Sequence, residues 1–336
     1  MAEFKKILIT GASGYVAKHV VLRALQAGYA VRGTVRSAAK GDQVRAAMAR
    51  HLEGGDPGDR LEFALADLTS DEGWAAAMDG VDALIHTASP FPSAPPKDAD
   101  DVIRPAVDGT LRVLRAAQGA GVFRLVLTSS TVAVLSARDA MHTEDDWQDL
   151  PKAGAYEQSK VRAERAAWDF VKTHPEMQMT VINPSFVQGA PLDDDFATSL
   201  EMVQRFLSGK DPMLPNLGFP VVDVRDVARL HVDALTTEGT IGERFIAADR
   251  FLTMRDMAEA IAVAVPDRKI VTRGAPDILI RFLSLFDPAV RMVLPFLGRR
   301  ADASGDKARR VFGQPLLPAA EAVQAGARYL VDNGHA

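Results

Sequence analysis

The first half of this 336-residue chain alternates short apolar runs typical of strands with longer segments of helical periodicity. The expected strands are KKILIT (5–10), AVRGTV (30–35), LEFALA (61–66), DALIHT (82–87) and RLVLTS (124–129), and the expected helices cover 16–27, 43–51, 71–78 and 103–118. Strands and helices that take turns along a chain form right-handed crossovers and a parallel sheet with helices on both faces. The pattern predicts a doubly wound α/β fold, which a helix over 155–173 and a strand over 180–183 extend.

After about residue 184 the pattern becomes less regular, because proline and glycine interrupt it repeatedly. The interruptions are PSFVQGAP (184–191), KDPMLPNLGFP (210–220), GAPDIL (274–279) and GQPLLP (313–318). We expect one domain over 1–183, to which 220–247 returns, and a smaller, mostly helical lobe made of 184–219 and 248–336.

The composition is that of an ordinary globular protein, with 47% hydrophobic and 25% charged residues. A net charge of −5 gives no general attraction to nucleic acid, and the absence of cysteine excludes disulfides and thiolate metal sites. The apolar stretch 278–297 contains Arg281, Asp287 and Arg291, so we predict no membrane span. This stretch could cap a hydrophobic pocket or lie on a membrane surface. No export signal is visible at the N-terminus, so we expect a cytoplasmic protein.

The segment GASGYVA follows the first expected strand and opens the first expected helix. Gly11, Gly14 and Ala17 are spaced three apart. Glycine lets a backbone approach a phosphate closely, and the N-terminus of a helix offers unpaired N–H groups and the positive end of its dipole. The turn therefore predicts a dinucleotide pyrophosphate site in a Rossmann domain, although tight turns also use glycine for steric reasons alone.

The ends of the next strands indicate which dinucleotide is bound. The second strand ends in GTVRS (33–37), and no carboxylate follows until Asp42. Arg36 can pair with a 2′-phosphate, which favours NADP(H) over NAD, or it is an ordinary surface charge. Asp67 could receive the adenine amino group or could cap a helix. His86 has no other ligand at metal-binding spacing, so we expect a packed or loop-orienting residue and no metal.

Tyr156 and Lys160 lie four residues apart in a segment with helical periodicity, so both project from one face of the helix. The fifth strand ends in Ser129 and Ser130, at the same carboxyl edge of the sheet as the glycine turn. A hydroxyl, a phenol and an ammonium at this edge can meet over a nicotinamide ring. Taken alone, the same spacing would also be found for a tyrosine that packs in the core and a lysine that is solvated on the surface.

The chain resembles the extended short-chain dehydrogenase/reductases, in particular the branch of dihydroflavonol 4-reductase, cinnamoyl-CoA reductase and NADPH-dependent aldehyde or ketone reductases. The resemblance covers nearly the whole chain, and the motifs that carry it are GASGYVA, TVR, ADL, HTASPF, LTSS, YEQSK, INPSFVQGAP and VDVRDVA. It implies that Ser130 donates a hydrogen bond, that Tyr156 is the acid/base and that Lys160 assists Tyr156. The neighbouring Lys160 ammonium and the positive oxidised nicotinamide would together lower the pKa of Tyr156.

The same resemblance implies a set of NADP(H) contacts along the carboxyl edge of the sheet. These are Gly11, Ser13, Gly14, Tyr15, Val16, Arg36, Asp67, Leu68, Thr87, Ala88, Ser89, Thr128, Tyr156, Lys160, Asn183, Pro184, Ser185 and Val187. The plant reductases carry an asparagine-containing motif after their serine, whereas this chain has TVAVLS (131–136), so a flavonoid substrate is not favoured.

The expected substrate is a hydrophobic aldehyde or ketone, reduced by a monomer or homodimer. The segments predicted to wall its pocket are Phe91–Pro92, Phe186–Val187, Met213–Leu214, Leu217–Phe219 and Ile278–Leu285, all aromatic or aliphatic in character. They could equally form the core of the small lobe. A nucleotide-sugar epimerase or dehydratase of the same superfamily and an NADP(H)-binding sensor without catalysis remain as alternatives.

Overall fold

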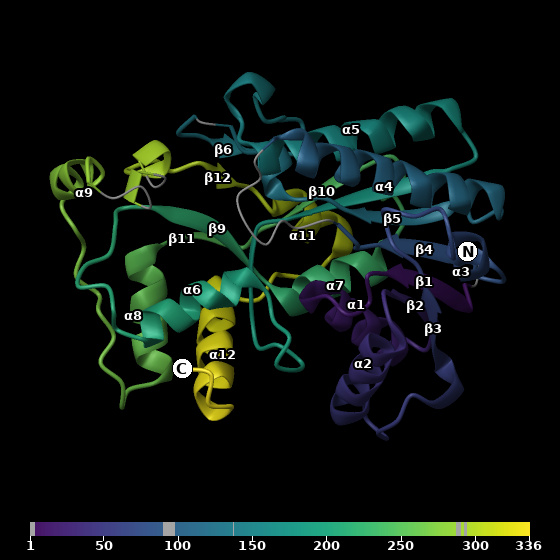
Figure 1. The fold of residues 1–336 in the computed structure, drawn as a ribbon, viewed down its shortest axis with the longest axis horizontal. Helices are drawn as coiled ribbons and strands as arrows, with labels where there is room; N and C mark the ends of the chain where they lie inside the picture. Colours follow the sequence, from purple (N-terminus) through teal and green to yellow (C-terminus); the bar gives the residue numbers. More distant parts are fainter. Residues whose placement is uncertain (1–3, 90–97, 137, 287–289, 292–293) are drawn as a thin grey trace.

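The computed structural model describes residues 4–89, 98–136, 138–286, 290–291 and 294–336, so the predicted wall segment Phe91–Pro92 lies outside the described residues (Figure 1). Its centre is a seven-stranded sheet of order β10-β7-β5-β4-β1-β2-β3 in which all pairings are parallel. The strands are β1 (Lys6–Thr10), β2 (Ala30–Val35), β3 (Leu61–Leu65), β4 (Ala83–His86), β5 (Arg124–Thr128), β7 (Gln178–Pro184) and β10 (Arg244–Ala247). The predicted doubly wound α/β fold is confirmed.

Helices cover both faces of this sheet (Figure 1). On one face lie α1 (Tyr15–Gln26), α2 (Ala38–His51) and α7 (Val224–Asp233), and on the other α3 (Trp74–Met78), α4 (Asp100–Gly119) and α5 (Ala155–Thr173). Successive residues of a strand point to opposite faces, so Ile7 and Ile9 pack with the first group of helices while Leu8 packs with the second. Both layers are therefore fully buried cores.

Three helices begin three or more residues from the predicted start, and one of them is α4, which begins at Asp100 and not at 103. α2 begins at Ala38 and not at 43, because the side chain of Ser37 accepts a hydrogen bond from the Lys40 amide and caps the helix earlier. α3 begins at Trp74 and not at 71, because Gly73 adopts a positive φ of 84° and the preceding residues form a turn. The indole N–H of Trp74 donates to the carbonyl oxygens of Asp67 and Ser70 and closes that turn.

Beside the main sheet lies a second, three-stranded sheet of order β11-β9-β8. Its strands are β8 (Phe186–Gln188), β9 (Gly218–Asp223) and β11 (Arg250–Thr253), and the helices α6 (Thr198–Leu207), α8 (Met254–Ala264) and α12 (Ala319–Asp332) form a core with it. Within the segment 220–247, α7 packs on α1 and β10 joins the main sheet, whereas β9 belongs to the small sheet.

The remaining elements are short. They are β6 (Met141–His142), β12 (Asp302–Ala303), α9 (Asp277–Leu283), α11 (Asp306–Phe312) and the single turns η1 (Gly58–Arg60), η2 (Thr131–Ala133), η3 (Leu150–Lys152) and η4 (Leu294–Phe296). None of the helices in the described part of the chain has the length and apolar character needed to cross a membrane.

Candidate active site

The strand order reverses between β1 and β4, and the turn from β1 into α1 lies at this point. Gly11 has a φ of +63°, and a Cβ added to it would lie 3.0 Å from the Cβ of Ala88. Its amide donates to Thr34 Oγ1 at 2.9 Å, and the Gly14 amide donates to the Gly11 carbonyl at 2.9 Å. The turn is thus built for glycine, and the first N–H groups of α1 begin directly after it.

His86 ends β4 and holds the neighbouring loop. Its Nδ1 lies 2.7 Å from Thr10 Oγ1, which accepts a hydrogen bond from the Ala88 amide at 3.0 Å. The hydroxyl of Thr87 donates to the Thr10 carbonyl. Burial lowers the pKa of His86 to about 3, so the imidazole is neutral at physiological pH. His86 is packed and orients the loop, and the described residues hold no cluster of side chains suited to a metal ion.

Arg36 follows β2 directly and its side chain is exposed at the carboxyl edge of the sheet. Asp67 follows β3 nearby, where its Oδ1 accepts hydrogen bonds from the amide (2.8 Å) and hydroxyl (2.6 Å) of Thr69. These bonds, with a smaller contribution from Arg36, lower the pKa of Asp67. Asp67 therefore closes the turn before α3, while α3 itself is preceded by Gly73. Leu68 is half-buried beside it.

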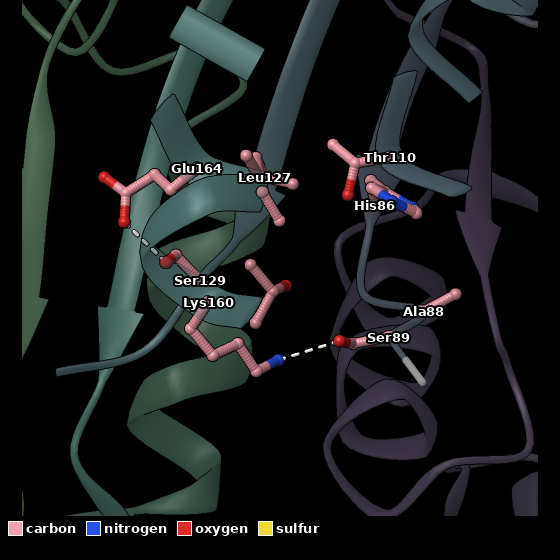
Figure 2. Close-up of a pocket in the computed structure, with 10 residues that line it drawn as sticks. His86, Ala88, Ser89, Thr110, Leu127, Ser129, Lys160 and Glu164 are labelled. Atoms are coloured by element: carbon pink, nitrogen blue, oxygen red, sulfur yellow. Dashed lines mark hydrogen bonds between the residues drawn. The ribbon is translucent and has the colours of Figure 1, made fainter. Parts of the chain in front are cut away.

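Ser130 caps η2, where its Oγ accepts a hydrogen bond from the Val132 amide at 3.3 Å. Tyr156 and Lys160 lie one turn apart in the first half of α5, with Lys160 Nζ 5.7 Å from the centroid of the Tyr156 ring. Lys160 Nζ also donates to Ser89 Oγ at 2.8 Å, as Figure 2 shows.

The pKa values of the pair are set mainly by burial. Burial, and after it the charge of Glu157, raises the pKa of Tyr156 to about 12. Burial lowers the pKa of Lys160 to about 8. In this structure the loss of solvation raises the tyrosine pKa, while the expected lowering by Lys160 together with an oxidised nicotinamide concerns the cofactor-bound protein and stays a prediction. The phenol is consequently protonated at neutral pH.

A cleft with a volume of about 690 Å³ joins the glycine turn to the Ser130–Tyr156 region. Its lining includes Gly11, Gly14, Tyr15, Val16, Thr87, Ser130, Tyr156 and Ser185. The lining also includes the apolar side chains of Leu135, Phe186, Val187, Phe196 and Phe219, and the rings of Phe186 and Phe219 stack with centroids 5.0 Å apart. No charged side chain is among the described residues that line it.

The other predicted contacts lie around this cleft. Ala88, Ser89, Thr128 and Lys160 line a small cavity of about 20 Å³, together with His86, Thr110, Leu127, Ser129, Ala163 and Glu164 (Figure 2). Asn183 and Pro184 are buried at the end of β7, and Ser13 is half-buried in the glycine turn. Arg36, Asp67 and Leu68 lie farther along the same edge of the sheet, at the ends of β2 and β3.

Only part of the predicted apolar wall lies in the cleft. Phe186, Val187 and Phe219 line it, whereas Leu214 and Leu217 are buried and Met213 packs in a small cluster with α9. None of the residues 278–285 is among the described residues that line the cleft, and Ile278, Phe282 and Leu285 are more than half exposed on the surface. The helix at 277–283 therefore does not cap this pocket.

Sequence reasoning missed Glu164 and Arg244, which form a buried ion pair beside the site, and Phe196 in the cleft wall. Glu164 follows Lys160 by four residues, so the spacing that singled out Tyr156 and Lys160 also marks Glu164 as a residue of the same helix face. No comparable signal marks Arg244, which is 80 residues farther along the chain.

Comparison with known proteins gives consistent matches. Residues 7–248 match the sequence profile of the NAD dependent epimerase/dehydratase family. Cinnamoyl-CoA reductase 1 of Arabidopsis thaliana is 36% identical over 277 residues, which cover 80% of this chain and 77% of that protein. Anthocyanidin reductase of Vitis vinifera is 30% identical over 288 residues, covering 80% of this chain and 83% of that protein.

Solved structures agree with these sequence matches. The yeast methylglyoxal/isovaleraldehyde reductase complexed with NADPH has a TM-score of 0.81 at 25% identity, covering 98% of this chain and 100% of that one. The Candida albicans protein Gre2 in complex with NADPH has a TM-score of 0.80 at 27% identity, covering 98% of this chain and 99% of that one.

Proposed function

The chain belongs to the NAD dependent epimerase/dehydratase family, and we propose that it is an NADPH-dependent reductase that converts a hydrophobic aldehyde or ketone into the alcohol. The observation that carries the proposal is the single cleft in which the glycine turn, Ser130, Tyr156 and an uncharged aromatic wall meet. The relatives support it, because they are named as reductases and two of the similar structures contain NADPH.

The residues present fit a dinucleotide. Gly11 and Gly14 leave a cradle where a side chain would intrude, and the N-terminus of α1 offers N–H groups to a pyrophosphate. Ser185 Oγ is buried, and among the described residues it has no hydrogen-bond partner although Ser185 lines the cleft. Such an orphaned hydroxyl suits a polar group of a bound ligand.

The preference for NADP(H) rests on Arg36, whose exposed guanidinium suits a 2′-phosphate where NAD-binding domains use a carboxylate. Asp67 and Leu68 would border the adenine, Thr87, Ala88, Ser89 and Thr128 the middle of the dinucleotide, and Asn183, Pro184 and Val187 its nicotinamide side.

The bound cofactor would supply the hydride. Ser130 and Tyr156 would donate hydrogen bonds to the carbonyl oxygen, on which negative charge develops during the reaction. Tyr156, whose phenol is protonated at neutral pH, would then give its proton to that oxygen. Lys160, with a pKa of about 8, is mostly an ammonium at neutral pH and would favour the transient phenolate.

The substrate class follows from the lining of the cleft. Leu135, Phe186, Phe196 and Phe219 offer apolar surface to a carbonyl compound. A nucleotide sugar would bring a second diphosphate, and charges buried without partners are costly. The uncharged lining therefore favours a hydrophobic carbonyl over a nucleotide sugar.

The test is turnover by the pure protein. NADPH consumption would be measured with aromatic aldehydes, aliphatic α-keto esters, dihydroflavonols, and UDP- and GDP-sugars, with product analysis for each. We expect reduction of at least one simple hydrophobic carbonyl. Conversion of a nucleotide sugar alone would identify an epimerase or dehydratase, and tight NADPH binding without any turnover would identify a sensor.

Further proposals concern organisation. We propose a dinucleotide-binding domain over 1–183 that includes most of 220–247, and a substrate lobe made of 184–219 and 248–336. A monomer or homodimer located in the cytoplasm, without a nucleic-acid partner, stays a prediction.

A further inference from the structure

Glu164 is a buried carboxylate with four donors around it. It lies on α5 one turn after Lys160, and its side chain is fully buried. Oε2 accepts hydrogen bonds from Ser129 Oγ and from Asn183 Nδ2, the latter at 2.9 Å. Oε1 accepts from Arg244 Nε at 2.6 Å and from Trp168 Nε1 at 3.3 Å. One carboxylate thus joins α5, the end of β5, β7 and β10.

Arg244 is itself held in place. Its Nη1 donates to the carbonyl oxygens of Glu144 at 2.6 Å and Asp146 at 3.0 Å, and its guanidinium lies 3.9 Å from the centroid of the Trp147 ring. The pair Glu164–Arg244 is therefore fixed from both sides. A buried ion pair seldom stabilises a fold more than apolar residues of the same size would, so stability alone is a weak reason for it.

The contacts of Glu164 converge on the dipeptide Ser129–Ser130. Ser129 is bound by its hydroxyl to Glu164, and its amide donates to the Ile182 carbonyl at 2.8 Å. Asn183 Nδ2 is shared between Glu164 and the Ser130 carbonyl, which it reaches at 3.2 Å. Figure 2 shows the hydrogen bond between Ser129 and Glu164. Ser130 then directs its side chain into the main cleft.

We propose that Glu164 is a positioning residue for Ser130: it holds the end of β5 directly through Ser129 and indirectly through Asn183, so that the Ser130 hydroxyl meets the substrate oxygen. This inference rests on the proposed carbonyl reductase function. Glu164 does not line the main cleft and takes no part in proton transfer. It acts because reacting groups must be held to within a fraction of an ångström for efficient reaction.

Three variants test the inference. Glu164→Gln keeps the shape and removes the charge. Glu164→Leu with Arg244→Leu removes both buried charges, which avoids leaving Arg244 uncompensated. Glu243→Gln is the matched control, because it makes the same change in the neighbour of Arg244. It breaks the partly exposed ion pair between Lys307 and Glu243. We expect Glu164→Gln to lower kcat by about 10-fold or more, with the KM of the carbonyl and the Kd of NADPH changed by less than about 3-fold.

A double-mutant cycle with Ser130→Ala identifies the residue through which Glu164 acts. If Glu164 positions Ser130, Glu164→Gln should lower kcat by no more than about 2-fold once Ser130 is alanine, because the interaction is already lost. The Leu/Leu variant should keep a wild-type melting temperature and still have a low kcat. Additive losses in the cycle, or a Leu/Leu variant that regains wild-type kcat, would overturn the inference.

Amide hydrogen exchange provides a readout that does not depend on turnover. We expect the amides of Ser129 and Val132 to exchange at least about 10-fold faster in the Leu/Leu variant, while core strand β1 is unchanged. If the wild-type protein reduces no carbonyl, the proposed function fails and this measurement still decides the inference. Unchanged exchange at Ser129 and Val132 would then contradict it.

Discussion

Tyr156 is half-buried in the wall of the cleft, and we propose it as the proton donor of the reaction. The loss of solvation raises its pKa to about 12, so the phenol carries its proton at neutral pH. Replacing Tyr156 by Phe keeps the ring and removes the hydroxyl. We expect turnover to fall by at least about 10²-fold while the Kd of NADPH stays within about 3-fold of wild type.

The matched control is Tyr329→Phe. Tyr329 also has a pKa raised to about 12. Its hydroxyl donates a hydrogen bond to Asp194, and Tyr329 is not among the described residues that line the cleft. This variant should turn over at the wild-type rate. Retained turnover in Tyr156→Phe would rule out Tyr156 as the proton donor.

The predicted cofactor preference likewise depends on one side chain, that of Arg36. Arg36→Gln removes a charge that would pair with a 2′-phosphate, so the Kd of NADPH should rise by about 10-fold or more while that of NADH changes little. Fluorescence titration of both cofactors measures this. Arg104→Gln, which alters an exposed arginine on α4, is the control. An unaltered protein that binds NADH more tightly than NADPH would contradict the prediction.

At the scale of elements, the turn between β1 and α1 contains two glycines that are needed for different reasons. Gly11 has a positive φ and its Cβ would come within 3.0 Å of the Ala88 Cβ, whereas Gly14 has a φ of −72° and its Cβ would lie 3.4 Å from the Gly11 carbonyl oxygen and 3.9 Å from the Ala17 Cβ. Gly11→Ala should therefore lower the melting temperature markedly. Gly14→Ala should fold with a nearly unchanged melting temperature and lose NADPH affinity, because its methyl group would face the cleft.

Thermal unfolding and NADPH titration of the two variants measure the difference. The reference variant is Gly239→Ala, because the exposed Gly239 also has a positive φ, of 75°, but an added Cβ would meet no atom within 4 Å. If Gly11→Ala and Gly14→Ala had the same melting temperature, the turn would not require glycine at position 11.

The helix boundaries show where the periodicity of the sequence is sufficient to predict the ends of an element. The predicted helix over 155–173 coincides with α5, because its apolar residues repeat at helical spacing over the whole length. The starts of α2 and α3 were missed because a serine cap and a glycine turn set them, and periodicity does not register caps. The stretch 278–297 was expected to cap a hydrophobic pocket or to lie on a membrane surface. Its helix α9 does not line the cleft, and an apolar segment does not reveal what it packs against.

At the scale of the whole molecule, the fold and much of the candidate site could be predicted because their signals are local. Glycines follow a strand, hydroxyl groups end a strand, and Tyr156 and Lys160 share one helical turn. Arg244 and Phe196 could not be predicted, since they reach Glu164 or the cleft only through the folded arrangement of distant segments. Nor did the sequence indicate that burial would dominate the pKa of Tyr156.

Three buried histidines couple the stability of the whole fold to pH. Burial lowers the pKa of His19 to about 4, of His86 to about 3 and of His231 to about 4. In the unfolded chain each has a pKa near 6.5, so below that pH the unfolded state binds protons that the folded state does not. The free energy of unfolding should therefore fall as pH drops below about 6.5, towards the folded-state values. Between pH 7 and pH 5 the loss is about 2 kcal/mol for each histidine.

Urea denaturation at constant ionic strength between pH 8 and pH 5 measures this loss, in a range above the pKa of most carboxylates. His231→Gln removes one of the three titrating groups; the native imidazole lies 2.7 Å from the Thr128 hydroxyl and 2.7 Å from the Val227 carbonyl. Whatever the variant costs in absolute stability, its pH dependence should be about one third smaller than that of the wild type, because proton uptake on unfolding falls from three sites to two. A free energy of unfolding that is flat from pH 7 to pH 5, or an unchanged slope in His231→Gln, would mean that these imidazoles are not buried in their neutral form.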